Sequence, residues 1–279
     1  MTPARPPGSD ALGETLAYYR DLGVAELYLD ARSEEKEEEE ISANGKRAAA
    51  NAAAGPAVTL PSAPASFTFE ENTPHPAASK ADRRASALEL QSLEKEVSSC
   101  VTCRLCKTRK QTVFADGSSG ARIMFIGEAP GADEDAQGVP FVGRAGQLLT
   151  RMIEDGMGLP RSAVYIANVL KCRPPENRNP EPDEIAACRG YLEKQIDLVK
   201  PEVLVALGKF AAHFLLETEE GITRMRGKWG SYRGIPVMPT LHPSYLLRQP
   251  AQKKEAWEDL LAVLARLGID APARKGKQP

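Results

Sequence analysis

From about residue 85 onward, apolar and polar positions form blocks of two kinds. Nearly continuous apolar runs predict strands that are covered on both faces, at residues 122–127, 164–169, 202–207 and 235–240. Elsewhere apolar residues recur every three or four positions, which predicts helices at residues 143–155, 182–200, 208–216 and 252–267. Strands that alternate with helices favour an α/β fold, with a parallel sheet sandwiched by helices.

The chain before residue 85 has a different pattern. Residues 10–30 place apolar side chains at helical spacing, which predicts a short amphipathic helix within a segment of residues 1–30. This helix either docks on its own domain or lies in the groove of a protein partner. Residues 31–84 are acidic or rich in Pro and Ala, so we expect a disordered tether. The folded domain is then expected at residues 85–270, followed by a basic disordered tail at residues 271–279.

Composition narrows the class of protein. The chain has 279 residues, of which 42% are hydrophobic and 27% charged, as in ordinary soluble globular proteins. It lacks both the run of roughly 20 apolar residues that crosses a bilayer and the apolar run of a signal peptide, so we expect a cytoplasmic protein with no membrane contact. The net charge of −2 divides into −7 for residues 1–99 and +5 for the remainder, which suits a surface that meets phosphates.

Five cysteines in a chain without a secretory signal favour metal binding over disulfides. Cys100, Cys103 and Cys106 lie in CVTCRLC, and Cys172 and Cys188 follow far downstream. A CxxC pair and one distant pair can complete a four-thiolate site. Zinc and an iron–sulfur cluster both accept four thiolates, and spacing alone does not separate them. A buried free thiol is a credible alternative for Cys106 or Cys188 taken alone.

In parallel sheets, ligands bind at the carboxyl ends of the strands, and the distinctive motifs of this chain lie there. The first strand leads into the glycine-rich segment GEAPGADEDAQGVPFVGRAG. It lacks the lysine of a P-loop and the GxGxxG spacing of a dinucleotide fold, which disfavours a nucleotide cofactor. The last strand leads into HPSYLLR, and its strand-end position favours a functional role for His242 over a surface or core role.

Four segments occur in order along the chain: GEAPG, PFVGRAG, ANVLKCRPPENR and HPSYLLR. Together they resemble the family 4 uracil-DNA glycosylases over residues 85–267. The resemblance implies an α/β/α sandwich with a four-stranded parallel sheet. It also implies a 4Fe-4S cluster and a DNA repair enzyme that flips uracil out of DNA, hydrolyses its N-glycosidic bond and leaves an abasic site.

The resemblance also implies a set of cluster ligands. Cys100 and Cys103 match the first pair, and Cys172 and Cys188 match the second pair. Cys106 is then the spare thiol. A shifted pairing of Cys103 with Cys106 stays open, because both spacings are CxxC.

Matching positions suggest the uracil site as well. Phe141 matches the aromatic residue that stacks on uracil, Asn168 the amide that reads its edge, and His242 the histidine that donates to the departing base. Glu128 and Ala129 occupy the first motif, where the best-known uracil glycosylases have glutamine and aspartate. We expect Glu128 to orient the attacking water and Ala129 to lie at the base.

Further residues are expected around this site. Glu134 would line the pocket near C5 of uracil and help to exclude thymine. Leu246 and Leu247 are either the first turn of a helix or a wedge for the gap left by the flipped base. Arg144 and Arg248 are candidate DNA contacts, and we expect a minority of real phosphate contacts among other basic residues: Lys107, Arg109, Lys110, Arg173, Arg178, Arg226 and Lys228.

The sequence leaves three alternatives open. One is a glycosylase of the same superfamily that acts on another deaminated base. The second is a non-catalytic DNA-binding iron–sulfur protein, which would bind uracil-containing DNA without cleaving it. The third is an iron–sulfur electron carrier, which has no need for Phe141, Asn168 and His242 at strand ends. The sequence carries no oligomeric signal, so a monomer is the expected state.

Overall fold

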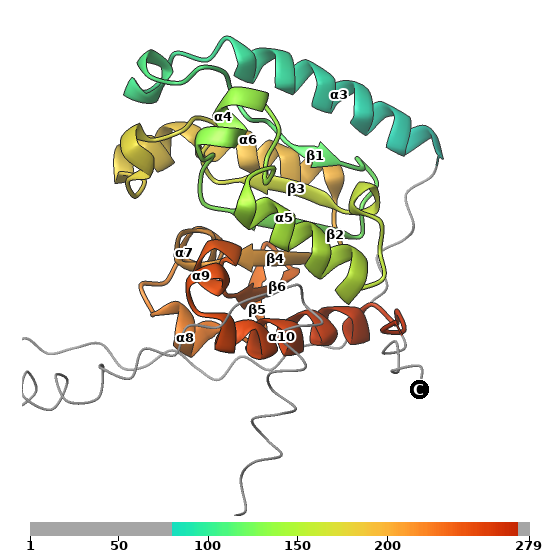
Figure 1. Cartoon of the computed structure of the whole chain (residues 1–279). Helices are drawn as coiled ribbons and strands as arrows, with labels where there is room; N and C mark the ends of the chain where they lie inside the picture. The colour runs from blue at the N-terminus through green and yellow to red at the C-terminus, as the bar shows by residue number, and fades with distance from the viewer. Residues whose placement is uncertain (1–79, 273–279) are drawn as a thin grey trace, which may run out of the picture. The chain divides into compact units, whose positions relative to one another are not determined.

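The structure is a computed structural model that describes residues 80–272 (Figure 1). The expected helix at residues 10–30, the tether up to residue 79 and the tail from residue 273 therefore lie outside the described residues. Within residues 80–272 no helix combines the length and the apolar character needed to cross a membrane.

The centre of the sheet consists of four parallel strands, each within one residue of the range that the apolar runs predict. They are β2 (Ile123–Gly127), β3 (Tyr165–Asn168), β4 (Val203–Leu207) and β6 (Ile235–Thr240). Every residue of β2, β3 and β4 is buried, as expected for strands that are covered on both faces.

The expectation of four strands is corrected to six, because two short antiparallel strands extend the sheet at its edges. The strand order is β1-β3-β2-β4-β6-β5, with β1 at Asp116–Gly117 and β5 at Gly230–Tyr232. Arg233 and Gly234 join β5 to β6 with φ angles of 50° and 82°, the left-handed pair of a tight hairpin turn. Strands of two or three residues carry no hydrophobic periodicity, so the sequence pattern does not reveal them.

Helices cover both faces of the sheet. Successive strand residues point to opposite faces, so Met124 and Ile126 pack with α3, α6 and α7, whereas Ile123 and Phe125 pack with α5 and α10. The bounds of these helices are α3 Lys80–Ser98, α5 Arg144–Arg151, α6 Pro182–Val199, α7 Lys209–Leu216 and α10 Lys253–Arg266. Figure 1 shows α3 and α10 on opposite sides of the sheet. The expected sandwich is therefore present.

Helix α3 is an element that the sequence reasoning missed. Leu90, Leu93 and Val97 are buried at helical spacing and share a core cluster with Leu192 and Ile196 of α6. Because α3 begins at Lys80, residues 80–84, which we expected in the tether, belong to a helix.

Shorter elements shape the loops between the strands and helices. A π-helical turn, Met152–Gly156, follows α5 within the range expected for one longer helix. The remaining short helices are α4 Ala132–Gln137, α8 Ile222–Met225 and α9 Pro243–Arg248, with 3-10 turns at Arg104–Lys107, Arg161–Ala163, Pro175–Asn177 and Pro250–Gln252.

Candidate active site

The carboxyl ends of the strands bring together residues that are far apart in the sequence. Gly127, the last residue of β2, pairs with Asn168, the last residue of β3, and Glu128 follows directly. His242 stands two residues after β6. It lies beside Gly208 at the end of β4, where an added Cβ would come within 2.9 Å of the Cβ of His242. All three expected catalytic residues therefore lie at one edge of the sheet.

Phe141 is held in a strained conformation beside this edge. Its φ is 55°, a left-handed value that costs an aromatic residue about 1–3 kcal/mol. Its ring centroid lies 5.7 Å from that of His242. A Cβ on Gly127 would overlap the Phe141 ring and Oδ1 of Asn168, and a Cβ on Gly146 would overlap the backbone carbonyl of Phe141. These two glycines allow the aromatic ring, the amide and the imidazole to lie close together.

Glu134 stabilises the loop that carries Phe141. Its Oε1 accepts hydrogen bonds from the backbone N–H groups of Val142 and Gly143, both at 2.9 Å, and its Oε2 accepts from Gly131 at 3.1 Å. Both carboxylate oxygens are thus engaged with the backbone. This capping role of Glu134 is not predicted from the sequence. The usual capping pattern begins with Ser or Thr, whereas the N-cap of α4 is Gly131. The expected role of Glu134 near C5 stays a prediction.

Asn168 presents a buried acceptor without a partner. The residue is 2% exposed, and its Oδ1 makes no hydrogen bond. Among the described residues, one other buried side-chain oxygen is unpaired, in Gln195. That second amide lies between the sheet and its helices, where its nitrogen donates to Phe114 O and Tyr165 Oη. Asn168 is the unpaired amide at the carboxyl edge of the sheet.

His242 is held as a neutral imidazole with a defined tautomer. It is the N-cap of α9, and its Nδ1 accepts the backbone N–H of Ser244 at 3.1 Å. An accepting Nδ1 leaves the proton on Nε2. Burial, followed by the charge of Arg248, lowers the pKa of His242 to about 4. At neutral pH the side chain is therefore an uncharged Nε2–H donor.

Glu128 and Ala129 begin the loop after β2. Glu128 is half-buried, and burial raises the pKa of its carboxyl group to about 7. Ala129 packs against a small apolar cluster that contains Leu170, Cys172 and Cys188. Ala129 therefore lies against the cysteine region. The carboxyl group of Glu128 titrates near neutral pH.

The expected DNA contacts separate into exposed and engaged residues. Leu246 is fully buried in a cluster with Leu148 and Leu241, so it is not available as a wedge, and that expectation is corrected. Leu247 is 39% exposed and remains the candidate. Arg144 and Arg248 are exposed.

Three of the other basic candidates are used inside the protein. Arg226 pairs with Asp259 at 2.6 Å, Arg178 with Glu184, and Arg109 with the cysteine region described below. Lys107, Lys110 and Lys228 are exposed and remain candidates for phosphate contacts.

All five cysteines line one small cavity between the segment that precedes the sheet and the loop after β3. Burial raises the pKa of the Cys188 thiol and raises that of Cys172 to about 11. Cys106 also faces a second, more open groove, which sets it apart from the other four thiols. Within the described residues, no three Cys, His, Asp or Glu side chains converge closely enough for a single metal ion.

Two cationic side chains, Arg109 and Lys171, border this cavity. Their contacts with the cysteines are not predicted from the sequence. Arg109 donates from Nη1 to Sγ of Cys172 at 3.2 Å and from Nη2 to the carbonyl of Cys100 at 2.7 Å. Lys171 is 1% exposed, and its backbone N–H donates to Sγ of Cys188 at 3.3 Å. Burial lowers the pKa of Lys171 to about 8. In the sequence Lys171 ends an apolar run and is easily taken for a solvated residue.

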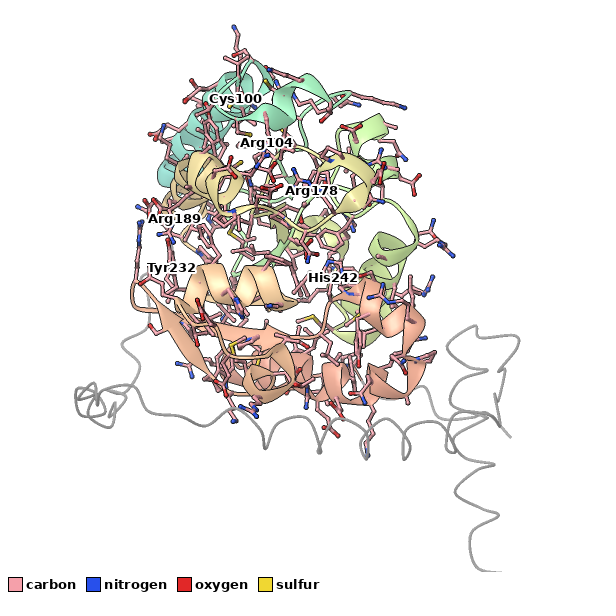
Figure 2. The ribbon with its side chains drawn as sticks, turned by 90° about the vertical axis from the view of Figure 1, so that its left-hand side faces the viewer. Cys100, Arg104, Arg178, Arg189, Tyr232 and His242 are labelled. Atoms are coloured by element: carbon pink, nitrogen blue, oxygen red, sulfur yellow. The ribbon has the colours of Figure 1, made fainter. Side chains whose placement is uncertain are left out.

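An ion network fastens the cysteine segment to α6. Glu184 is fully buried. It accepts hydrogen bonds from both Nη groups of Arg178, at 2.9 and 2.5 Å, and forms an ion pair with Nε of Arg104 at 3.1 Å. The hydrogen bonds from Arg178 are the main reason that the pKa of Glu184 is lowered. In Figure 2 the two arginines lie between Cys100 and His242. The network therefore joins the cysteine region to the loop that follows β3.

Comparison with known proteins places this geometry in a family. The family model of the Uracil DNA glycosylase superfamily matches residues 114–261, more than half of the chain. The type-4 uracil-DNA glycosylase of Sulfurisphaera tokodaii is 46% identical over 180 residues, which cover 61% of this chain and 81% of that protein. The chain belongs to the type-4 uracil-DNA glycosylases.

Two proteins of one organism show how this type-4 family member relates to its neighbours. The type-4 uracil-DNA glycosylase of Pyrobaculum aerophilum is 42% identical over 181 residues, covering 62% of this chain and 92% of that protein. The type-5 uracil-DNA glycosylase of the same organism is 30% identical over 173 residues, covering 56% of this chain and 74% of that protein. The higher sequence identity therefore favours type 4 over type 5.

Proposed function

We propose that this protein excises uracil from DNA by flipping the nucleotide out, hydrolysing its N-glycosidic bond and leaving an abasic site. The observation that carries the proposal is the buried, unpaired Oδ1 of Asn168 at the strand edge that also holds Phe141 and His242. An unsatisfied buried acceptor costs about 1–3 kcal/mol. A ligand that brings an N–H group to this oxygen removes that cost.

Uracil supplies the matching edge. Its N3–H donates to Oδ1 of Asn168, while its O4 accepts from the amide nitrogen of the same side chain. Cytosine presents an acceptor and an amino donor at these two positions, so the amide rejects it. The ring of Phe141 stacks on the base, a contact worth about 1–3 kcal/mol that offsets part of the cost of unstacking.

His242 and Glu128 act on the bond that breaks. As the N-glycosidic bond lengthens, negative charge develops on O2 of uracil, and the Nε2–H of His242 donates to it. A neutral donor with a fixed tautomer requires no proton to be gained or lost during this step. Glu128, with a pKa of about 7, orients the water that captures the sugar cation and accepts its proton.

Cys100, Cys103, Cys172 and Cys188 are proposed to hold a 4Fe-4S cluster. Their thiols lie around one cavity, and the buried cation Lys171 adjoins them, as does Arg109. This arrangement suits a large, negatively charged centre better than a single ion. When bound, the cluster would cross-link distant parts of the chain, and the residues at the strand ends carry out the hydrolysis.

The test is single-turnover incubation with single- and double-stranded DNA that contains one uracil, followed by alkaline cleavage of abasic sites. Wild-type protein is expected to cleave at uracil. Asn168→Ala should lose at least about 100-fold in rate at subsaturating enzyme, where the rate reports kcat/KM, while binding of undamaged DNA stays unchanged, because phosphate contacts dominate affinity. Asn179→Ala, which alters an exposed amide, is the matched control. Wild-type protein that binds uracil-containing DNA without cleaving it would establish the non-catalytic alternative.

A second DNA substrate tests which base the site reads. DNA with hypoxanthine in place of uracil is expected to be cleaved far more slowly. Its N1–H and O6 offer the same donor and acceptor, but on a larger purine whose glycosidic nitrogen lies farther from that edge. Equal rates on both substrates would instead support the alternative of a glycosylase for another deaminated base.

A further inference from the structure

One buried charge connects the two regions described above. Lys171 lies in the loop after β3, three residues beyond Asn168 and directly before Cys172. Its Nζ donates to the backbone carbonyl of Asn168 at 2.7 Å, and its own backbone N–H donates to Sγ of Cys188 at 3.3 Å. A single residue therefore contacts both the residue proposed to read uracil and a thiol proposed to bind the cluster.

The surroundings of this ammonium leave its charge to be balanced by the cysteines. Lys171 is 1% exposed, and it lines the same small cavity as the five cysteines. Within the described residues, no carboxylate forms an ion pair with it. A buried ammonium without a counter-charge is costly. A centre with four thiolate ligands provides the missing negative charge.

We propose that Lys171 is a positioning residue that couples the cysteine-bound centre to the amide of Asn168. Its ammonium holds the carbonyl of Asn168 while its backbone N–H holds Sγ of Cys188, and this fixes the end of β3 from which the amide reads the base. The inference rests on the proposed function, since it requires both a cluster on the four cysteines and base reading by Asn168. It assigns to the centre an influence on base affinity beyond its cross-linking of the fold.

The experiment compares three substitutions in the full-length, cluster-loaded protein. Lys171→Met removes the charge and the hydrogen bond, Lys171→Gln retains a polar donor without the charge, and Lys171→Arg retains the charge. Lys194→Met, which removes an exposed lysine on α6, is the matched control. The measurements are the reduction potential of the cluster, the rate of iron release to a chelator, and kcat and KM on uracil-containing DNA.

Lys171→Met and Lys171→Gln are both expected to shift the potential to more negative values and to release iron faster, because a neighbouring cation favours the more negatively charged state. Lys171→Met should also raise KM about tenfold with little change in kcat, since base reading is lost equally from the bound and transition states. Lys171→Gln should raise KM less. Lys171→Arg and Lys194→Met should retain the wild-type potential.

Two results would overturn the inference in distinguishable ways. If the wild-type protein contains no iron or sulfide, the cluster assignment in the proposed function is wrong, and the coupling is overturned as well. Wild-type protein with a full cluster, together with Lys171 variants that keep its potential and KM, overturns the coupling alone and leaves the proposed function intact.

Discussion

The strand-end site and the cysteine region are both partly buried, but they are organised in opposite ways. At the strand ends, close packing at Gly127 and Gly146 brings an aromatic ring to an amide whose oxygen has no partner. Around the cysteines, cations gather: Arg109 and Lys171 adjoin the thiols, and a network centred on Glu184 fastens the segment in place. One region leaves hydrogen-bonding capacity open, and the other supplies excess positive charge.

The difference shows what each region is built to receive. An unpaired acceptor beside an aromatic ring suits a neutral planar ligand that arrives and leaves. Buried cations around thiols suit a permanent anionic centre, because their own burial is costly without it. Substitutions in the cysteine region should therefore affect stability first, whereas those at the strand ends should affect catalysis first.

The largest effect is expected in the cysteine region. Replacing Cys172 or Cys188 with Ser should abolish cluster binding and unfold much of the protein, because structural metal centres contribute on the order of 10 kcal/mol to folding. Cys106→Ser should keep the cluster. Iron and sulfide content and thermal unfolding provide the measurements. If Cys106→Ser loses iron while Cys100→Ser retains it, the ligand pair is Cys103 and Cys106 instead.

At the strand ends, His242→Ala should slow single-turnover excision by about 100- to 1,000-fold, the usual cost of one preorganised donor. The unfolding free energy should fall by no more than about 0.5–2 kcal/mol, the cost of losing the α9 cap. His213→Ala, which removes a histidine bonded to the carbonyl of Glu220, is the control and should keep full activity. A stability loss as large as that of the cysteine variants would contradict the contrast between the regions.

Glycine substitutions test the strained aromatic residue. Gly146→Ala places a Cβ onto the backbone carbonyl of Phe141, so we expect a loss of about 1–3 kcal/mol in unfolding free energy and slower excision. Gly190→Ala in α6 meets no atom within 4 Å and should stabilise the protein by about 0.5–1 kcal/mol. Chemical denaturation measures both. Equal behaviour of the two variants would show that Phe141 tolerates displacement.

The smallest effect concerns pH. Glu128 has a pKa of about 7, so its carboxyl group is protonated below neutral pH and cannot accept a proton from water. Single-turnover excision should therefore rise as pH increases through about 7, with a slope of about tenfold per unit on the acid side. Glu128→Gln should flatten this profile. His242 does not contribute to this limb, because its pKa is about 4. An unchanged profile in Glu128→Gln would remove Glu128 from the reaction.

The sequence predicts the centre of the fold better than its edges. The four parallel strands are buried on both faces, so each appears as an apolar run within a residue of its true bounds. Strands β1 and β5 are too short to show a period, and their pairing depends on neighbours distant in the sequence. Helix α3 has apolar spacing, but its polar first turns resemble the tether before it.

The site shows a similar division. Strand-end positions such as Asn168 and His242 follow from topology, because the carboxyl ends of parallel strands meet at one edge. Leu246 and Leu247 are adjacent leucines, and only the rotation of α9 decides that the first is buried and the second partly exposed. The position of Lys171 depends on the path of a loop, which no local pattern encodes.

The two short edge strands also bear on how the protein behaves at high concentration. An open sheet edge exposes unpaired N–H and C=O groups that recruit strands from other molecules. Here the parallel core ends in strands of two and three residues, and one of the closing turns carries Arg233, whose guanidinium lies over the ring of Tyr232 at 5.2 Å. Edges so short, with a charge beside one of them, offer a poor template for intermolecular pairing. The same edge strands therefore protect an apolar sheet from aggregation.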